Sequence, residues 1–467
     1  MPRKLGKDVA WLWAGYLARA VAYFGLIVVL TRELGPAGFG SLSLFLAVTL
    51  GVSQVAGSWP FLAVPVLSAQ GRTIGAAFRP AVYVAALATA ASLLVAVPIS
   101  FLLQSRAAIS LLAVVGYSLA LVGLQGIYAI QQTEGKMAGI ALLQTGDRLL
   151  ALGLALAAAA VFTLDVLEAE VLLTVASVVS CAIALIVIGR RQKLFRRHAD
   201  DVPDHPISTV MSSVGAMGIV SLCSYGVAWA DIFILAAFRP NSDVGIYSLA
   251  YQLFTFVAQL GSLWAVAALP VHARSTASGH GLAEQLPIPR LAAYTCLWAA
   301  LIAAAAVGSV VVLPYAFGSD FSAAATPLLV LLAGSGIFAA AYFAVLPGLI
   351  AAGQSGLIAK VAGGSVAINI VLDLILVPPL GVLGPALATV GQSVFGTIAL
   401  AGIVLGFRPT LRLLAVGAPA ILATTLLAID PNDAGLAIFC ALVAIATGLS
   451  GLAMTYRAGG LPTAARV

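Results

Sequence analysis

The sequence is a succession of apolar segments of about 20 residues or more, separated by short polar stretches. A helix needs roughly 20 mostly apolar residues to cross a bilayer, because a rise of about 1.5 Å per residue must span about 30 Å of hydrocarbon. Hydrophobic residues make up 62% of the chain and charged residues only 9%, whereas soluble domains have about 45–50% and about 25%. The pattern predicts an all-α integral membrane protein with fourteen membrane helices, at residues 9–31, 40–66, 80–103, 107–131, 137–162, 168–189, 209–238, 245–270, 291–316, 325–351, 358–377, 384–406, 411–429 and 434–456.

The basic residues predict the orientation of these helices. Of the 23 Lys and Arg residues, eighteen fall on the side of the N-terminus, three on the other side (Arg32, Arg106 and Arg239) and two inside helices. Cytoplasmic loops of membrane proteins carry an excess of Lys and Arg. We therefore expect both termini in the cytoplasm, and the net charge of +6 needs no nucleic-acid partner.

An internal repeat indicates that the chain has two related halves. A shift of 205 residues aligns "GSLSLFLAVTLGVSQVAGSWPFLAVPV" (40–66) with "GIYSLAYQLFTFVAQLGSLWAVAALPV" (245–271) without a gap, with identities that include Trp59/Trp264 and Gln54/Gln259. A shorter echo pairs "KMAG" (136–139) with "KVAG" (360–363). The repeat unit is then six helices, and an even number gives both halves the same orientation, related by a pseudo-twofold axis along the membrane normal. We expect an N-lobe at 1–190, a basic cytoplasmic linker at 191–208, a C-lobe at 209–407, and helices 13 and 14 with a cytoplasmic tail at 408–467.

Five formal charges lie inside the predicted helices: Arg19, Asp147, Arg148, Asp231 and Asp373. Each costs roughly 2.5–3.5 kcal/mol on insertion scales when it faces lipid. We therefore expect these side chains to face a cavity or one another.

Helical spacing groups further polar residues with the two charges on the first helix of each half. Tyr16 and Tyr23 lie three before and four after Arg19, and Ser221 and Ser224 share a face with Asp231. A water-filled cleft lined by both helices, with Gln54 and Gln259 contributed by their neighbours, would satisfy these groups together. Direct neutralisation of Arg19 by Asp231 is the alternative, and the two glutamines could equally join helices by hydrogen bonds.

The remaining charges leave structural and functional roles open. Asp147 and Arg148 point about 100° apart, so each needs a partner from another helix. Asn369 and Asp373 share a face at i, i+4 and suit a structural role as well as a site. The four cysteines (Cys181, Cys223, Cys296 and Cys440) show no metal-binding or redox spacing, so we expect no metal and no cofactor.

Three stretches resemble the polysaccharide transporters of the multidrug/oligosaccharidyl-lipid/polysaccharide exporter superfamily. They are "LTRELGPAGFGSLSLFLAV" (30–48), "VGIYSLAYQLF" with the following "ALPV" (244–271), and "NIVLDLILVPPLGVLGPALATV" (369–390). The resemblance implies two six-helix lobes in a V shape and alternating access. It also implies flipping of undecaprenyl-pyrophosphate-linked oligosaccharide across the bacterial cytoplasmic membrane, for lipopolysaccharide or exopolysaccharide. Pro385 departs from the small residue that the family has after the glycine of "LGPALAT", which puts the local geometry in doubt.

The hypothesis is that Arg19 binds the pyrophosphate, since a guanidinium can donate two parallel hydrogen bonds to a phosphate. Related flippases keep cations at such a place on helix 1, and Arg148 resembles an arginine of helix 5 in the polysaccharide branch. Tyr16, Tyr23, Gln54, Gln259 and Ser224 would complete the lumen. Asp231, with Asp147, Asp373 and Asn369 as further candidates, would load and release a proton or cation.

The partners implied are the lipid-linked oligosaccharide, membrane lipids, a polysaccharide polymerase and a chain-length regulator. The leading alternative is a cation-coupled multidrug exporter of the same superfamily. A major-facilitator carrier is disfavoured because "SAQGRTIGAAFRP" lacks the G-x-x-x-D-R-x-G-R-R pattern. A membrane polymerase or ligase is disfavoured because the outer loops are short and acidic (Asp165, Glu168 and Glu170). We expect a transporter and not an enzyme.

Overall fold

The computed structural model describes residues 2–69, 73–103, 108–134, 136–192, 206–277, 288–336, 345–350 and 352–457 of the 467. Within these ranges the regular elements are helices and there is no strand. Eleven helices of the described part are long and apolar enough to cross a membrane, and one of them, at 55 residues, covers the first two predicted segments. The prediction of an all-α membrane protein is confirmed.

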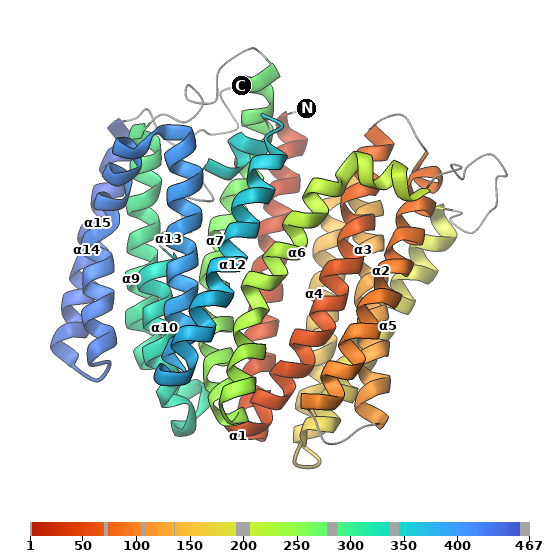
Figure 1. The fold of residues 1–467 in the computed structure, drawn as a ribbon, viewed down its shortest axis with the longest axis horizontal. Coiled ribbons are helices and arrows are strands. Elements are labelled where there is room, and N and C mark those ends of the chain that lie inside the picture. The colour runs from red at the N-terminus through yellow and green to blue at the C-terminus, as the bar shows by residue number, and fades with distance from the viewer. Residues whose placement is uncertain are drawn as a thin grey trace. The chain divides into compact units, whose positions relative to one another are not determined.

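The chain divides into two compact units, residues 1–229 and 230–467. Unit 1 holds α1 (Pro2–Ala69), α2 (Ile74–Leu103), α3 (Ala108–Thr133), α4 (Met137–Ala159), α5 (Val166–Gln192) and most of α6 (Pro206–Phe238). In it, α1 packs against α2, α3 and α4, and α5 packs against α3 (Figure 1). The lobe boundaries predicted from the repeat stay a prediction, and residues 193–205 of the basic linker and 458–467 of the tail lie outside the described residues.

The first two predicted helices form one continuous element with a kink. Gly35 has φ 62° and ψ 179° inside α1, a backbone conformation that is essentially restricted to glycine. Pro36 follows, and its fixed φ and missing N–H suit the first turn of the helix that continues to Ala69. Two membrane segments are thus joined without a loop, which the alternation of apolar and polar stretches did not reveal.

Unit 2 contains the end of α6 and the remaining elements. They are α7 (Asn241–Ala277), α9 (Ile288–Phe317), the short 3₁₀ helix η2 (Ser319–Ala324), α10 (Ala325–Leu331), the π-helical turn η3 (Leu332–Gly336), a helical piece at 345–350, α12 (Ser355–Leu380), α13 (Leu383–Leu405), α14 (Phe407–Ile429) and α15 (Ala434–Arg457). The pairs α12–α13 and α9–α15 pack side by side, and α9 also contacts α14 (Figure 1). Within the segment predicted at 325–351, α10 is followed by the π-helical turn at Leu332–Gly336, the chain is helical again at 345–350, and residues 337–344 lie outside the described part.

A tight turn joins α12 to α13 and answers the question that Pro385 raised. Gly381 takes φ 57°, and a Cβ on Gly384 would lie 2.7 Å from the backbone of Leu376 and Val377, so only glycine allows this approach. Pro385 is the third residue of α13. Its missing N–H has no intrahelical acceptor at that position in any case, so the proline is tolerated there.

The repeat is visible in the register of the elements. The part of α1 beyond the kink begins at Pro36 and α7 begins at Asn241, so the 205-residue shift of the sequence also relates the starts of these helices. The match of "KMAG" with "KVAG" likewise aligns the start of α4, in sequence, with the second turn of α12. The sequence repeat thus pairs the second part of α1 with α7, and α4 with α12.

Candidate functional site

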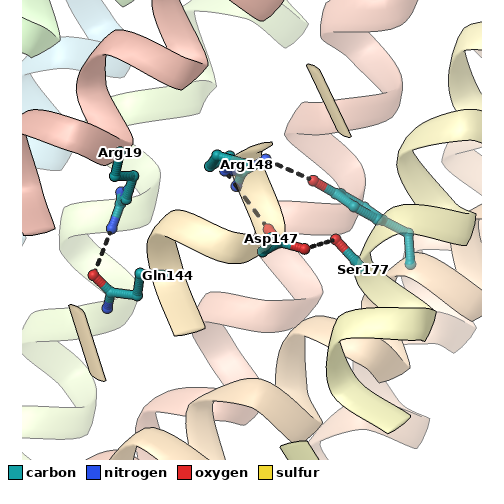
Figure 2. Close-up of polar contacts among 6 residues, drawn as sticks. Arg19, Gln144, Asp147, Arg148 and Ser177 are labelled. Atoms are coloured by element: carbon teal, nitrogen blue, oxygen red, sulfur yellow. Dashed lines mark hydrogen bonds and ion pairs between the residues drawn. The ribbon is translucent and has the colours of Figure 1, made fainter. Parts of the chain in front are cut away.

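Arg19 lies where α1 and α4 approach each other closely in unit 1. A Cβ on Gly15 would run into the Ala141 side chain, and Thr145 donates a hydrogen bond to the Gly15 carbonyl at 3.1 Å. One turn further along α1, the Arg19 Nη1 donates to the Gln144 Oε1 at 3.1 Å (Figure 2). The close packing of the two helices thus sets Arg19 beside a neutral amide.

Arg148 and Asp147 have acquired the partners from other helices that their divergent directions required. The Arg148 Nη1 donates to the Tyr117 hydroxyl of α3 at 3.5 Å, its Nε lies 3.7 Å from the Asp147 carboxylate, and its guanidinium lies 5.1 Å from the centre of the Tyr23 ring. Asp147 is 5% exposed and accepts a hydrogen bond from Ser177 of α5 at 2.9 Å (Figure 2). Arg148 is therefore paired with an acid, an aromatic ring and a hydroxyl.

The two arginines differ in how their charges are balanced. Arg148 has the Asp147 carboxylate as a counter-ion, whereas Arg19 has, among the described residues, the uncharged Gln144 as its hydrogen-bond partner. Arg19 also interacts electrostatically with Tyr16, Tyr23 and Arg148. Unit 1 therefore presents an arginine whose hydrogen-bond partner, among the described residues, is a neutral amide.

Asp231 lies at the centre of a second polar cluster, in unit 2. It is fully buried near the end of α6, and its Oδ2 accepts hydrogen bonds from the Tyr247 hydroxyl of α7 at 2.5 Å and from the Thr389 hydroxyl of α13 at 2.7 Å. Three helices thus meet at one carboxylate oxygen.

Asn369 and Asp373 of α12 face the same carboxyl group. Both are fully buried, on the stripe of α12 that faces the protein interior, and both interact with Asp231. Within the described part of the chain, no partner of hydrogen-bond geometry is found for the Asp231 Oδ1, either Asp373 oxygen or either amide atom of Asn369. Two carboxyl groups and an amide therefore converge with unused oxygen atoms, and neither acid has a basic partner among the ion pairs of the described residues.

The other predicted site residues take less distinctive positions. Gln54 and Gln259 are half-buried, on α1 and α7. Ser224 is exposed and donates its hydroxyl to the Val220 carbonyl of its own helix at 2.8 Å. The predicted cleft lined by both halves stays a prediction.

Sequence reasoning missed several partners of these charges. Gln144 could have been found, because it lies three residues before Asp147 and four before Arg148 on the same helix. Tyr247, Thr389 and Ser177 carried no such signal, since single hydroxyl residues are scattered through the apolar helices and their partners are distant in sequence.

The two clusters lie on equivalent helices of the repeat. In unit 1 the charged residues come from the first part of α1 and from α4, and in unit 2 from α6 and α12. The first cluster is net basic and the second carries two carboxyl groups. The two clusters thus differ in net charge, although their charged residues lie on helices that correspond in the sequence repeat.

The fold is similar to those of solved membrane transporters. The structure matches the lipid II flippase MurJ in its inward closed conformation with a TM-score of 0.72, over 96% of this chain and 99% of that one, at 11% sequence identity. It also matches an inward-facing multidrug resistance MATE transporter with a TM-score of 0.59, over 87% of this chain and 98% of that one, at 14% identity. At these identities the likeness establishes the fold.

The sequence comparisons add the family resemblance. Residues 60–276 match the family model described as polysaccharide biosynthesis protein. The chain is 26% identical over 186 residues to the "Probable low-salt glycan biosynthesis flippase Agl15" of Haloferax volcanii. That alignment spans 39% of this chain and 37% of the relative. The resemblance to polysaccharide transporters inferred from the sequence motifs is confirmed.

Proposed function

We propose that this protein flips a polyprenyl-linked oligosaccharide, specifically an undecaprenyl-pyrophosphate-linked repeat unit, across the bacterial cytoplasmic membrane for lipopolysaccharide or exopolysaccharide synthesis. The fold, the family match and the similarity to a glycan flippase support transport of a lipid-linked glycan. The cytoplasmic position of both termini rests on the distribution of Lys and Arg. A polymerase and a chain-length regulator would act on the flipped product.

The observation that supports the proposal is the hydrogen bond of Arg19 to a neutral amide, Gln144, in place of an acid. A guanidinium inside a membrane helix is costly unless it serves a pathway or meets a counter-ion. Its hydrogen-bond partner here is a neutral amide, so an anionic headgroup would supply the missing charge. The planar fork of arginine fits phosphate oxygens bidentately, which an ammonium group cannot reproduce.

The test is flipping of lipid-linked oligosaccharide in proteoliposomes containing Arg19→Gln, with Arg19→Lys beside it. A hydrogen bond to a charged group contributes about 1.5–3 kcal/mol, so we expect transport at limiting substrate to fall roughly tenfold to a hundredfold in Arg19→Gln. Arg19→Lys should retain part of the activity. Arg32→Gln removes the same charge from an exposed position of the same helix and is the matched control. Normal flipping by Arg19→Gln would refute the role of Arg19.

The Asp231 cluster supports a second role, coupling of transport to a proton or a monovalent cation. It offers two carboxyl groups, an amide and two hydroxyls, which are the oxygen ligands that hard cations prefer. We expect Asp231→Asn to abolish the dependence of flipping on an imposed proton or sodium gradient, whereas Asp320→Asn, at an exposed position of unit 2, should leave it intact. Gradient-dependent transport by Asp231→Asn at the wild-type rate would exclude coupling at this carboxylate.

A further inference from the structure

Unit 1 contains an ion pair, Asp147 and Arg148, that the proposed function leaves without a role. Asp147 and Arg148 are neighbours on α4, where Asp147 is buried and Arg148 is half-buried, and a pair of this kind is costly to desolvate. Replacing both by apolar residues would be no less stable in many proteins. The pair therefore calls for an explanation beyond stability.

The geometry of the pair is looser on the arginine side than on the acid side. Asp147 is fixed by the Ser177 hydroxyl at 2.9 Å, whereas the contacts of Arg148 to Asp147 and Tyr117 are 3.7 and 3.5 Å long. Strong charge-assisted hydrogen bonds are about 2.7–2.9 Å. Asp147 thus acts on Arg148 mainly through electrostatic attraction and not through a short hydrogen bond that would fix the guanidinium.

Arg19, Arg148 and Asp147 together determine the net charge at the proposed headgroup site. Arg19 and Arg148 each contribute one positive charge and Asp147 one negative charge, so the three side chains together present a single positive charge. Arg148 interacts electrostatically with Arg19, so its neutralisation by Asp147 is felt at the position where we place the headgroup. Without Asp147 the site would hold a polyanion with two positive charges.

We propose that Asp147 is a specificity-determining residue that sets the net charge of the headgroup site and so its preference among polyprenyl headgroups of different charge. Arg148 takes part through its charge and makes no direct contact with the headgroup. A more positive site would bind a diphosphate more tightly and release it more slowly after flipping. This inference rests on the proposed function, in which Arg19 binds the headgroup.

The test compares the binding of two probes, farnesyl diphosphate and farnesyl monophosphate, to the full-length protein in detergent. The readout is the ratio of the Kd for the monophosphate to the Kd for the diphosphate, which cancels general losses of affinity. Asp147→Asn, with a site charge of two, should raise this ratio roughly three- to tenfold, the effect of one charge several ångströms away in a protein dielectric. Arg148→Gln, with a site charge of zero, should lower the ratio by a similar factor.

The double variant Asp147→Asn/Arg148→Gln distinguishes a charge effect from a contact. Its site charge is again one, so the ratio should return to within about twofold of the wild type, even where each single variant shifts it. Asp147→Glu should keep the wild-type ratio, and so should Glu168→Gln, which removes one negative charge from an exposed position of α5.

The outcomes separate this inference from the proposed function. Unchanged ratios in both single variants overturn the role of Asp147 while binding that depends on Arg19 still supports the headgroup site. Failure of the double variant to recover also overturns it, because Arg148 would then contact the headgroup directly. Absence of binding of both probes to the wild type, or binding that Arg19→Gln leaves unchanged, overturns the inference together with the headgroup site.

Discussion

Removal of the Tyr247 hydroxyl is the sharpest test of the acidic cluster in unit 2. This hydroxyl and that of Thr389 both donate to one oxygen of Asp231, at 2.5 and 2.7 Å, and the carboxyl group is fully buried. Tyr247→Phe deletes one of the two donors and leaves the aromatic packing in place. A hydrogen bond to a charged group contributes about 1.5–3 kcal/mol of net stability.

The expected change in melting temperature follows from that free energy. For 150–250 residues, the size range of unit 2, each kcal/mol shifts Tm by about 2–4 °C, so Tyr247→Phe should lower Tm by about 3–12 °C. Thermal unfolding of the purified protein in detergent, followed by tryptophan fluorescence, measures the shift. Tyr251→Phe is the matched control, because its ring lies 5.9 Å from that of Tyr247 and its hydroxyl is not bonded to Asp231.

Two results would refute this reasoning. The first is a Tm for Tyr247→Phe that equals the value for Tyr251→Phe. The second is the same loss in an Asp231→Asn background, because the energetic cost is assigned to the carboxyl group and should shrink when that group is replaced. A loss that persists in the double variant would place the stabilising contact of Tyr247 elsewhere.

Two glycines give further tests within unit 1. A side chain at Gly51 would collide with the ring of Tyr225, whose hydroxyl donates to the Ala47 carbonyl at 2.8 Å. Gly51→Val should therefore lower Tm by more than Gly153→Val, where nothing lies within 4 Å of the added Cβ. Equal shifts would contradict the contact of Tyr225 with α1. Gly35→Ala places a Cβ at φ 62° and should cost about 1–3 kcal/mol. An unchanged Tm for Gly35→Ala would contradict this cost and would show that the backbone at residue 35 can leave the positive φ without loss of stability.

Much of the fold could be predicted because the bilayer imposes a minimum length on each apolar segment. The predicted ends of α3, α12 and α13 agree with the structure within a few residues. The continuity across Gly35 and the π-helical turn at Leu332 could not be predicted, because each depends on local backbone conformation that hydropathy does not report. Hydropathy therefore locates spans and says little about how their backbones bend.

The site was predictable where helical periodicity applies and not elsewhere. Asn369 and Asp373, one turn apart, do face the interior together, as their spacing indicated. The meeting of both with Asp231 joins residues more than 130 positions apart, and no local pattern encodes that distance. The same holds for Arg148 and Tyr117, whose contact depends on how α3 packs near α4.

Each of the two clusters of opposite charge draws its contacts from one unit of the chain. The charged residues lie on α1 and α4 in unit 1 and on α6 and α12 in unit 2, which are helices that correspond in the sequence repeat. Neutralising Arg19 and Asp231 together should therefore affect stability additively, because neither residue is a partner of the other within its cluster. Transport should behave differently. If headgroup binding and ion coupling drive one cycle, the loss of transport in the double variant should not exceed the larger of the two single losses. The difference between the loss in the double variant and the sum of the two single losses measures the coupling between the two units.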